Sequence, residues 1–462
     1  MKYRTESDSM GEVKIPEEFL YGASTQRAVE NFNVSHRRFD RRFIEALGLI
    51  KWASALANEE LKKLDPKIAK IIAEKSLEVA EGRHDPHFIL DIYQTGSGTS
   101  TNMNANEVIA NVSNQSLGSK LGSKSPVHPN DHVNKGQSSN DVIPTAIHVG
   151  AALGISQGLI PVLKKLEGAL TKKATEFKEI IKVGRTHLQD ATPVTLGQEF
   201  SGYASQVEHG IKRAEKALEE LLELAIGGTA VGTGINTDPK FAEKVCVLLS
   251  KKTGLKFYEA KNHFEAQAAK DASVFVSGAM KTIAVSFMKI ANDIRWLSSG
   301  PRCGIGEILL PELQPGSSIM PGKINPVIPE SVMQVAAQVQ GNDLAVQIGG
   351  QHGNFELNVM MPVIAGNLFE SIKLLTTASI MLAEKCVQGI QVNKERCQEL
   401  LEKSLMLVTN LNPVIGYDKA AAVAKKAFKE NRSVREILLK EKLVAEEQID
   451  RLLDPKSMLS PK

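Results

Sequence analysis

The sequence has few of the features that mark disulfide-rich, metal-binding or membrane-spanning proteins. It contains only four cysteines in 462 residues, and no two of them form a C-x-x-C pair. This spacing favours neither a disulfide framework nor a zinc site, and it gives no local support for three-cysteine ligation of an iron-sulfur cluster. We expect the cysteines to be small buried apolar residues. They are Cys246, Cys303, Cys386 and Cys397.

The chain also lacks long apolar runs and a strong excess of charge. No uninterrupted run approaches the roughly eighteen apolar residues of a membrane span, and the first residues, MKYRTESDSM, contain no apolar signal-peptide core. The formal net charge is +3, and the charged residues are well mixed, so neither a basic stripe for nucleic acid nor an acidic tail is present. We expect a soluble, cytoplasmic protein without a membrane or nucleic-acid partner.

Helical periodicity dominates what is present. Over residues 200–225 apolar positions alternate spacings of four and three, which predicts a helix with one apolar seam. Residues 160–181 repeat this pattern. Over residues 264–297 the apolar positions spread around the circumference, which favours burial on several sides and oligomerisation. Because few period-two stretches occur, the sequence predicts an all-α fold with a central bundle of long helices.

The pattern also suggests domain boundaries, since a chain of this length normally divides into two or three domains. Residues 1–137 mix short helical stretches with Gly, Ser, Asn and Pro clusters, and long helices dominate from near Asn140. We predict an N-terminal domain of residues 1–137, a central domain of residues 138–360 and a small helical C-terminal domain of residues 361–462. The pair Asn412-Pro413 marks a break before the final, highly charged segment.

One stretch, residues 316–330, has the composition of a binding loop and reads GSSIMPGKINPVIPE. Gly316 and Gly322 allow backbone conformations that other residues avoid, so N–H groups near Ser317 and Ser318 can converge on one point. Such a nest binds anions. The alternative is a polar surface loop without a function.

The second half of this stretch predicts the start of a helix. Pro326 and Pro329 have no N–H, which is tolerated only in the first turn, so the helix begins close to Pro326 and continues through Glu330. Its positive end lies beside the loop. Lys323 and Asn325 add a cation and an amide, which suits a small carboxylate or phosphate.

Three further stretches concentrate polar residues that a core would not hold without partners. They are TGSGTSTNMNAN at residues 95–106, VHPNDHVNKGQSSND at 127–141 and GRTHLQDATPVT at 184–195. The glycine-rich run at residues 227–234 lacks the spacing and context of a nucleotide-binding loop, so we interpret it as a structural turn. His84 and His87 have no third ligand nearby and indicate a solvated loop rather than a metal site.

The loop GSSIMPGKINP resembles the signature loop of the fumarase/aspartase superfamily, and the similarity covers nearly the whole chain. The stretches QSSND at residues 137–141 and NPVIGYDKA at residues 412–420, with Gly228, favour the class II, iron-independent fumarases. The stretch PVIPE at residues 326–330 is closer to the corresponding sequence of aspartases. Aspartate ammonia-lyase is therefore one alternative, and a non-catalytic structural member of the superfamily is another.

The resemblance implies a three-domain homotetramer whose long helices form the core and whose active sites combine residues from different subunits. It implies the tricarboxylic acid cycle reaction, reversible anti hydration of fumarate to L-malate through an aci-carboxylate carbanion. It implies no metal and no organic cofactor. The flexible loop at residues 316–326 is expected to act as a lid.

Site residues follow from the resemblance by position. Ser317 is the implied base, His187 the implied proton donor, Lys323 the cation that stabilises the base, and Glu330 the group that orients His187. The implied substrate-binding residues are Ser97, Gly98, Thr99, Ser138, Ser139, Asn140, Thr186, Ser318 and Asn325. A second dicarboxylate site is implied at His128, Pro129, Asn130 and Asp131.

Overall fold

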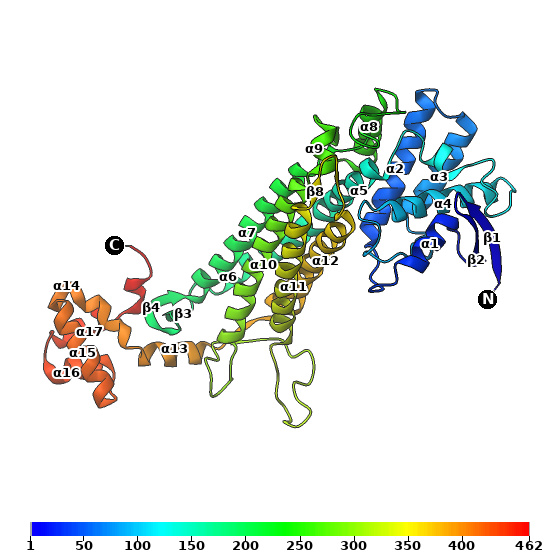
Figure 1. Ribbon diagram of the computed structural model, residues 1–462. Helices are drawn as coiled ribbons and strands as arrows, with labels where there is room; N and C mark the ends of the chain where they lie inside the picture. Colours follow the sequence, from blue (N-terminus) through cyan, green and yellow to red (C-terminus); the bar gives the residue numbers. More distant parts are fainter. Residues whose placement is uncertain (1, 462) are drawn as a thin grey trace. The chain divides into compact units, whose positions relative to one another are not determined.

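The computed structural model describes residues 2–461, and within them it is mainly helical (Figure 1). The described residues form seventeen α-helices and a few short strands, and these strands pair two by two. This confirms the predicted all-α class. The chain divides into two compact units. Unit 1 comprises Met1–Pro161, Gly210–Val285 and Val335–Thr377, and unit 2 comprises Val162–His209, Ser286–Gln334 and Ala378–Lys462. The predicted division into three domains stays a prediction.

The first part of unit 1 is a hairpin followed by short and medium helices. Its elements are β1 (Tyr3–Asp8), β2 (Gly11–Pro16), α1 (Ala23–Asn31), α2 (Arg41–Glu60), α3 (Pro66–Ala80), η1 (Asp85–His87), α4 (Thr99–Ser116), η2 (Pro129–Val133), α5 (Ser139–Leu153) and η3 (Gly154–Leu159). The antiparallel β1–β2 pair was not predicted, because the sequence at residues 1–137 was interpreted as helical stretches and turns.

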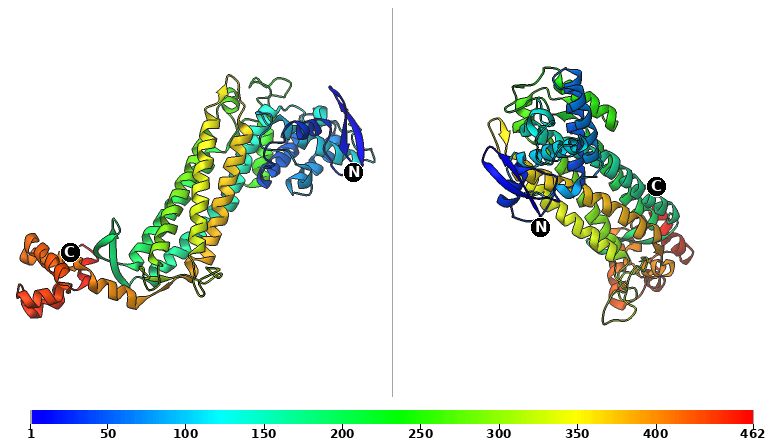
Figure 2. Two further views of the ribbon diagram at one scale, coloured as in Figure 1. Left: turned by 60° about the horizontal axis from the view of Figure 1, so that its bottom comes forward. Right: turned by 90° about the vertical axis from the view of Figure 1, so that its right-hand side faces the viewer.

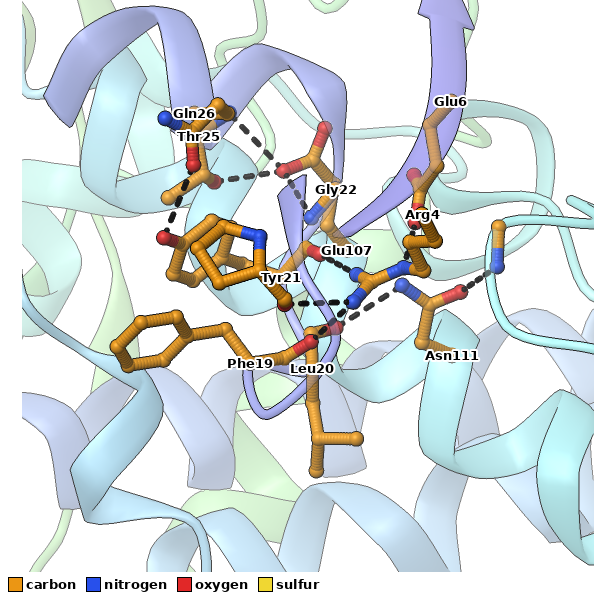
Figure 3. A network of polar contacts seen from close by, with 12 residues as sticks. Arg4, Glu6, Phe19, Leu20, Tyr21, Gly22, Thr25, Gln26, Glu107 and Asn111 are labelled. Carbon is orange, nitrogen blue, oxygen red and sulfur yellow. Dashed lines mark hydrogen bonds and ion pairs between the residues drawn. The ribbon is translucent and has the colours of Figure 1, made fainter. Parts of the chain in front are cut away.

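A buried carboxylate holds the start of α1 in place (Figure 3). Glu107 on α4 accepts hydrogen bonds from the backbone N–H groups of Gly22 and Thr25 at 2.9 and 3.1 Å, and from the Thr25 hydroxyl at 2.6 Å. A carboxylate at a helix N-terminus satisfies free N–H groups and complements the helix dipole. Arg4 donates to the carbonyls of Phe19 and Tyr21, which attaches the hairpin to the same place.

Long helices follow, and several contribute a segment to each unit. The elements are α6 (Ile160–Glu176), β3 (Ile181–Thr186), β4 (Gln189–Thr195), α7 (Leu196–Glu220), β5 (Glu223–Leu224), α8 (Phe241–Thr253), β6 (Tyr258–Glu259), α9 (His263–Ala268), α10 (Asp271–Leu297), β7 (Ile308–Leu309), α11 (Val327–Gly350), β8 (Gly353–Asn354), β9 (Leu357–Asn358) and α12 (Met361–Lys385). Figure 2 shows α7, α10, α11 and α12 running side by side. Within unit 1, Lys281 of α10 pairs with Asp343 of α11 at 2.6 Å.

The predicted apolar seams are largely buried, with shifts at their ends. Phe200, Val207 and Ala214 on α7 are buried, but Leu218 is only partly buried and Ala217 takes its place. The helix ends at Glu220 rather than at residue 225, because the chain turns there into β5. The pattern over residues 160–181 is also cut short, at Glu176, and the predicted helix over 264–297 breaks between α9 and α10.

The C-terminal part of unit 2 contains its own small core. Its elements are η4 (Val387–Gly389), β10 (Gln391–Val392), α13 (Lys394–Lys403), η5 (Leu405–Leu411), α14 (Asn412–Ile415), α15 (Tyr417–Glu430), α16 (Val434–Glu441), α17 (Glu446–Leu452) and η6 (Pro455–Met458). Leu411, Val423, Ile437 and Ile449 are among its fully or nearly fully buried residues. The charged segment after Asn412 therefore folds as several short helices around a common apolar centre.

Two helical stretches have the length and composition of a membrane span, which corrects the expectation from apolar runs. They are Ser139–Glu176, with mean hydropathy 1.6 over its most apolar part, and Asp271–Leu297, with 1.4. Counting only uninterrupted apolar residues missed both. The protein itself buries 61% and 44% of these parts, respectively. Core helices of soluble bundles pass the same test, so length and composition are weak evidence for a membrane here.

Candidate active site

In unit 1 the N-termini of two helices are joined by a chain of hydroxyl groups. α4 begins at Thr99 and α5 begins at Ser139. The Thr99 hydroxyl lies 2.7 Å from the Ser97 hydroxyl and 2.7 Å from the Ser139 hydroxyl. Helix N-termini carry partial positive charge and free N–H groups, so this junction suits a carboxylate.

Gly98 makes the approach to this junction possible. Its φ of 71° lies in the left-handed region, and an added Cβ would lie 2.9 Å from the Ile143 side chain. Only glycine avoids both penalties. The predicted residues Ser97 to Thr99 and Ser138 to Asn140 are therefore brought together, although their two stretches are far apart in the sequence.

A cavity of about 360 Å³ opens beside this junction. Its lining is mostly polar and consists of Thr99, Asn102, Met103, Asn134, Gly136, Gln137, Ser138, Ser139, Thr229, Ala230, Ile235 and Asn236. Asn140 is turned to one wall, where its amide donates to the Ala230 carbonyl at 2.8 Å. The cavity is large enough for a small organic acid, and its lining has little apolar surface to bind an apolar ligand.

The glycine-rich turn forms part of this cavity because Asp141 binds its backbone. The Asp141 carboxylate accepts N–H groups of Ser138, Gly227 and Thr229 at 2.9, 3.0 and 2.9 Å. Complete burial raises the pKa of Asp141 to about 6, although these hydrogen bonds oppose the shift. The structural-turn interpretation of residues 227–234 is confirmed. Sequence reasoning gave Asp141 no role, although S-x-x-D before an apolar run is the pattern of a helix capping box.

A buried lysine lies behind the cavity wall and was also missed. Lys51 on α2 is fully buried, and its ammonium donates to Asn102, Asn134 and Gln137 at 2.8, 3.0 and 2.9 Å. Burial lowers the pKa of Lys51 to about 7. The only signal in the sequence is a single charge within the otherwise apolar run ALGLIKWASALA at residues 46–57.

The residues of the expected second site form one tight turn in unit 1. His128 Nδ1 accepts the backbone N–H groups of Asn130 and Asp131, both at 3.2 Å. Pro129 begins the following π-helical turn, where its missing N–H costs nothing. The Asp131 side chain is 76% exposed, and one of its oxygens lies 3.3 Å from His128 Nδ1. The turn therefore presents an imidazole and a carboxylate together at the surface.

In unit 2, Thr186 and His187 lie at the exposed tip of the β3–β4 hairpin. His187 and Leu188 have φ values of 57° and 59°, so two successive non-glycine residues adopt the left-handed conformation. Tight two-residue hairpin turns require this backbone, and it carries a strain cost for side chains with a Cβ.

A buried ion-pair network anchors this hairpin. Arg185 donates two hydrogen bonds, each of 2.9 Å, to the Glu307 carboxylate, which is fully buried. The Lys182 ammonium lies 3.2 Å from the same carboxylate. The hairpin that carries His187 is thereby fixed to the chain that leads into the 316–326 loop.

The loop itself is closed by its own backbone. The Gly316 N–H donates to the Lys323 carbonyl at 2.8 Å, and the Asn325 amide donates to the Gly316 carbonyl at 2.6 Å. The Ser317 hydroxyl accepts the N–H groups of Ile319 and Met320 at 3.2 and 2.9 Å. Two successive N–H groups therefore converge on the Ser317 oxygen, and the anion nest expected near Ser317 and Ser318 stays a prediction.

The other predicted groups of unit 2 are exposed. Ser318 and Lys323 lie on the loop surface, and Glu330 lies in the first turn of α11, which begins at Val327 as predicted from the prolines. Among residues 2–461, no hydrogen bond joins His187 to Glu330. Their predicted pairing stays a prediction.

Two expectations about single residues are corrected. Cys303 is exposed, whereas the other three cysteines are buried as expected. His84 and His87 are partly buried rather than solvated, since His84 Nε2 lies 3.0 Å from a Glu78 oxygen and His87 Nδ1 accepts the Leu20 N–H.

The part of the chain that the structure describes contains no group of three or more His, Cys, Asp or Glu side chains arranged to hold a metal ion.

Comparison with known proteins identifies the family. Residues 11–341 match the family described as Lyase, and residues 407–460 match the one described as Fumarase C C-terminus. The chain is 54% identical over 462 residues to the mitochondrial fumarate hydratase of Rattus norvegicus, covering 100% of this chain and 91% of that protein. The chain belongs to the class II fumarate hydratases. The resemblance found in the sequence is thereby confirmed.

Other members of the class II fumarate hydratases support the same placement. The Methylorubrum extorquens class II fumarate hydratase is 52% identical over 458 residues, with 99% of this chain and 97% of that protein covered. The crystal structure of the class II fumarase from Schistosoma mansoni matches with a TM-score of 0.96 at 41% identity, covering 99% of both chains. Membership makes this chain a hydro-lyase, and the aspartase alternative suggested by the PVIPE stretch is not favoured.

Proposed function

We propose that this chain catalyses the reversible hydration of fumarate to L-malate, as a step of the tricarboxylic acid cycle. The observation that carries the proposal is the junction of two helix N-termini with the hydroxyls of Ser97, Thr99 and Ser139, beside a polar cavity. This junction supplies hydrogen-bond donors and positive potential for a carboxylate. The mostly polar cavity beside it does not favour a lipid. The rat and bacterial relatives are named for the same reaction.

The substrate carboxylate next to the reacting carbon needs the strongest binding. Removal of the C3 proton of malate moves an electron pair toward this carboxylate and creates a dianionic aci-carboxylate. Groups that bind it more tightly as charge develops lower the barrier. The proposed binding residues are Ser97, Gly98, Thr99, Ser138, Ser139, Asn140, Thr186, Ser318 and Asn325.

The proposed base is Ser317. A free serine hydroxyl is nearly inert as a base, so its alkoxide must be stabilised before it can accept the C3 proton. The N–H groups of Ile319 and Met320 already point at the Ser317 oxygen and would stabilise negative charge there. Lys323, which lies on the same loop, is proposed to add a positive charge when the loop closes over substrate.

The proposed acid is His187. The leaving hydroxyl of malate must take up a proton on the face opposite to the base, and an imidazole is suited to this transfer near neutral pH. Glu330 is proposed to orient the imidazole. His187 lies exposed at the strained hairpin tip, where a partner subunit can reach it.

The proposed assembly is a homotetramer whose active sites combine residues of different subunits. Helix α10 supports this, since Phe275 and Val285 are 52% and 51% exposed although both are large and apolar. The turn at His128 to Asp131 is proposed as a second dicarboxylate site, and its partly exposed imidazole supports that assignment. The proposed location is the cytoplasm, although the relatives include a mitochondrial protein.

The test of the reaction is an ultraviolet assay of fumarate formation from L-malate and, separately, from L-aspartate, with EDTA present. We expect rapid fumarate formation from malate alone. Formation from aspartate alone would show that the chain is an aspartate ammonia-lyase, as the aspartase-like sequence at residues 326–330 suggests. Activity with neither substrate, in folded protein, would favour a non-catalytic member of the superfamily.

A further inference from the structure

Lys51 lies on the buried side of the cavity wall and has no role in the proposed chemistry. It sits within α2, and none of its surface is exposed. Its three hydrogen-bond partners, Asn102, Asn134 and Gln137, all line the cavity. Lys51 therefore touches the cavity only through the side chains that form its wall.

The hydrogen bonds of Lys51 determine which way these amides face. An ammonium has three N–H donors and no acceptor, so each of the three amides must present its oxygen to Lys51. The amide nitrogens then point elsewhere. Asn134 donates to the Gln137 carbonyl at 3.1 Å, and Gln137 donates to the Val133 and Lys135 carbonyls at 3.1 and 3.2 Å.

These contacts fix the backbone immediately before α5. The pinned segment ends at Gln137, and the next residue is Ser138, which caps the helix and precedes Ser139 and Asn140. A loss of the ammonium would release the Asn134 and Gln137 side chains together. The hydroxyl of Ser139 would then lose its fixed place against Thr99.

A role in stability alone does not account for this arrangement. Burying an ammonium costs free energy, and an apolar side chain of similar volume often stabilises such a site better. Three neutral amides offset the cost only in part, and the lowered pKa of Lys51 reflects it. The three hydrogen bonds of the ammonium all go to the cavity wall, and its charge also attracts the buried carboxylate of Asp141, which holds the turn at Gly227 and Thr229.

We propose that Lys51 is a positioning residue that sets the affinity for the dicarboxylate substrate by fixing the amide wall of the cavity and the start of α5. The proposal rests on the proposed function, because it assigns this cavity to substrate. It predicts an effect on binding rather than on the proton transfers, which belong to other residues.

The experiment compares Lys51→Met with the wild-type enzyme in steady-state kinetics with fumarate and with L-malate. We expect KM to rise for both substrates by about ten- to a hundredfold, the value of a lost hydrogen bond to a charged group. We expect kcat to change far less. Lys51→Gln, whose amide keeps two N–H donors, should restore part of the affinity.

Lys173→Met is the matched control. Lys173 is also a buried lysine, whose ammonium donates to the Ile390 carbonyl at 2.8 Å and to Glu176 at 2.9 Å, but it does not contact the cavity wall. Its replacement should lower the melting temperature and leave KM unchanged. Circular dichroism and melting curves of all variants separate loss of fold from loss of affinity.

Three results would overturn the proposal. They are a folded Lys51→Met enzyme with KM within about twofold of wild type, an equal KM rise in Lys173→Met, and failure of both Lys51 variants to fold, which would make Lys51 a folding anchor. Failure of the proposed function has a different signature, since the wild-type enzyme would then convert neither malate nor fumarate.

Discussion

At the residue scale, the partly buried Ser317 hydroxyl has two N–H donors directed at its oxygen. The loop surrounds it with backbone groups that favour a negative charge, and within residues 2–461 no carboxylate makes a hydrogen bond with it. A serine in an ordinary turn accepts similar hydrogen bonds without acting as a base. Turnover of a variant decides between the two.

Ser317→Ala removes the proposed base without disturbing a buried contact. We expect kcat to fall by about 10² to 10⁴, the usual contribution of a positioned base, with an unchanged melting temperature. Ser123→Ala, at an exposed serine of a different loop, is the control and should leave both values unchanged. Near-normal turnover in purified Ser317→Ala would remove Ser317 from the mechanism.

His148 on α5 makes stability depend on pH. Its Nδ1 donates to the Glu223 carbonyl at 2.7 Å, and burial lowers the pKa of His148 from 6.5 to about 4. Because the folded-state pKa is below the unfolded value, the neutral form stabilises the protein above pH 6.5, and this contribution is lost as the pH falls toward 4.

His148→Gln keeps a donor for the Glu223 carbonyl and removes the titrating group. Between pH 7 and pH 4.5 we expect the wild-type free energy of unfolding to drop by about 2 to 3 kcal/mol more than that of the variant. Urea unfolding followed by circular dichroism measures both. Parallel pH profiles of the two proteins would contradict the assignment.

At the element scale, the 316–326 loop depends on one glycine for its closure. An added Cβ on Gly316 would lie 2.2 Å from the Lys323 carbonyl oxygen, far inside van der Waals contact. The loop could then no longer keep the Gly316 N–H bonded to Lys323, and the position of Ser317 would change with it.

Gly316→Ala should therefore impair catalysis while leaving the folded core intact. Displacement of reacting groups by about 1 Å costs roughly 10² in rate, so we expect kcat/KM to fall by about that factor. Gly168→Ala on α6 is the control, because no atom lies within 4 Å of the added Cβ. It should leave kcat/KM unchanged, and a similar loss there would show that the assay reports stability instead.

At the scale of the whole molecule, the predicted site residues divide between the two units of the chain. Ser97 to Thr99 and Ser138 to Asn140 belong to unit 1, whereas His187, Ser317 and Lys323 belong to unit 2. In a homotetramer with shared sites, one active site takes its unit 1 residues from one subunit and its unit 2 residues from another. A mixed tetramer can therefore contain sites in which both sets of residues are wild type. Two inactive variants should then complement each other.

Subunits carrying Ser317→Ala and subunits carrying Asn140→Leu are unfolded together, mixed and refolded. With equal amounts we expect recovery of up to about a quarter of the wild-type sites, the product of two chances of one half. Each variant refolded alone is the control. No recovery, or sedimentation as an active monomer, would contradict a site shared between subunits.

Much of the fold followed from local patterns. The all-α class came from apolar spacing, and the start of α11 came from Pro326 and Pro329, because a missing N–H restricts where a helix can begin. Helix ends were less predictable. α7 stops at Glu220 although its seam continues to residue 225, since tertiary pairing of β5 with β6 competes for those residues.

The sequence by itself determined the polar stretches and their resemblance to class II fumarate hydratases, because the functional groups of a loop come from residues that are adjacent in the sequence. Tertiary structure alone decided that α4 and α5 begin at the same point, and that Lys51 and Asp141 hold the walls around it. A buried charge acts on partners distant in the chain, so its role has no local pattern. The physical reason is that spacing along a chain encodes periodicity and turns, whereas the three-dimensional fold determines which groups share one cavity.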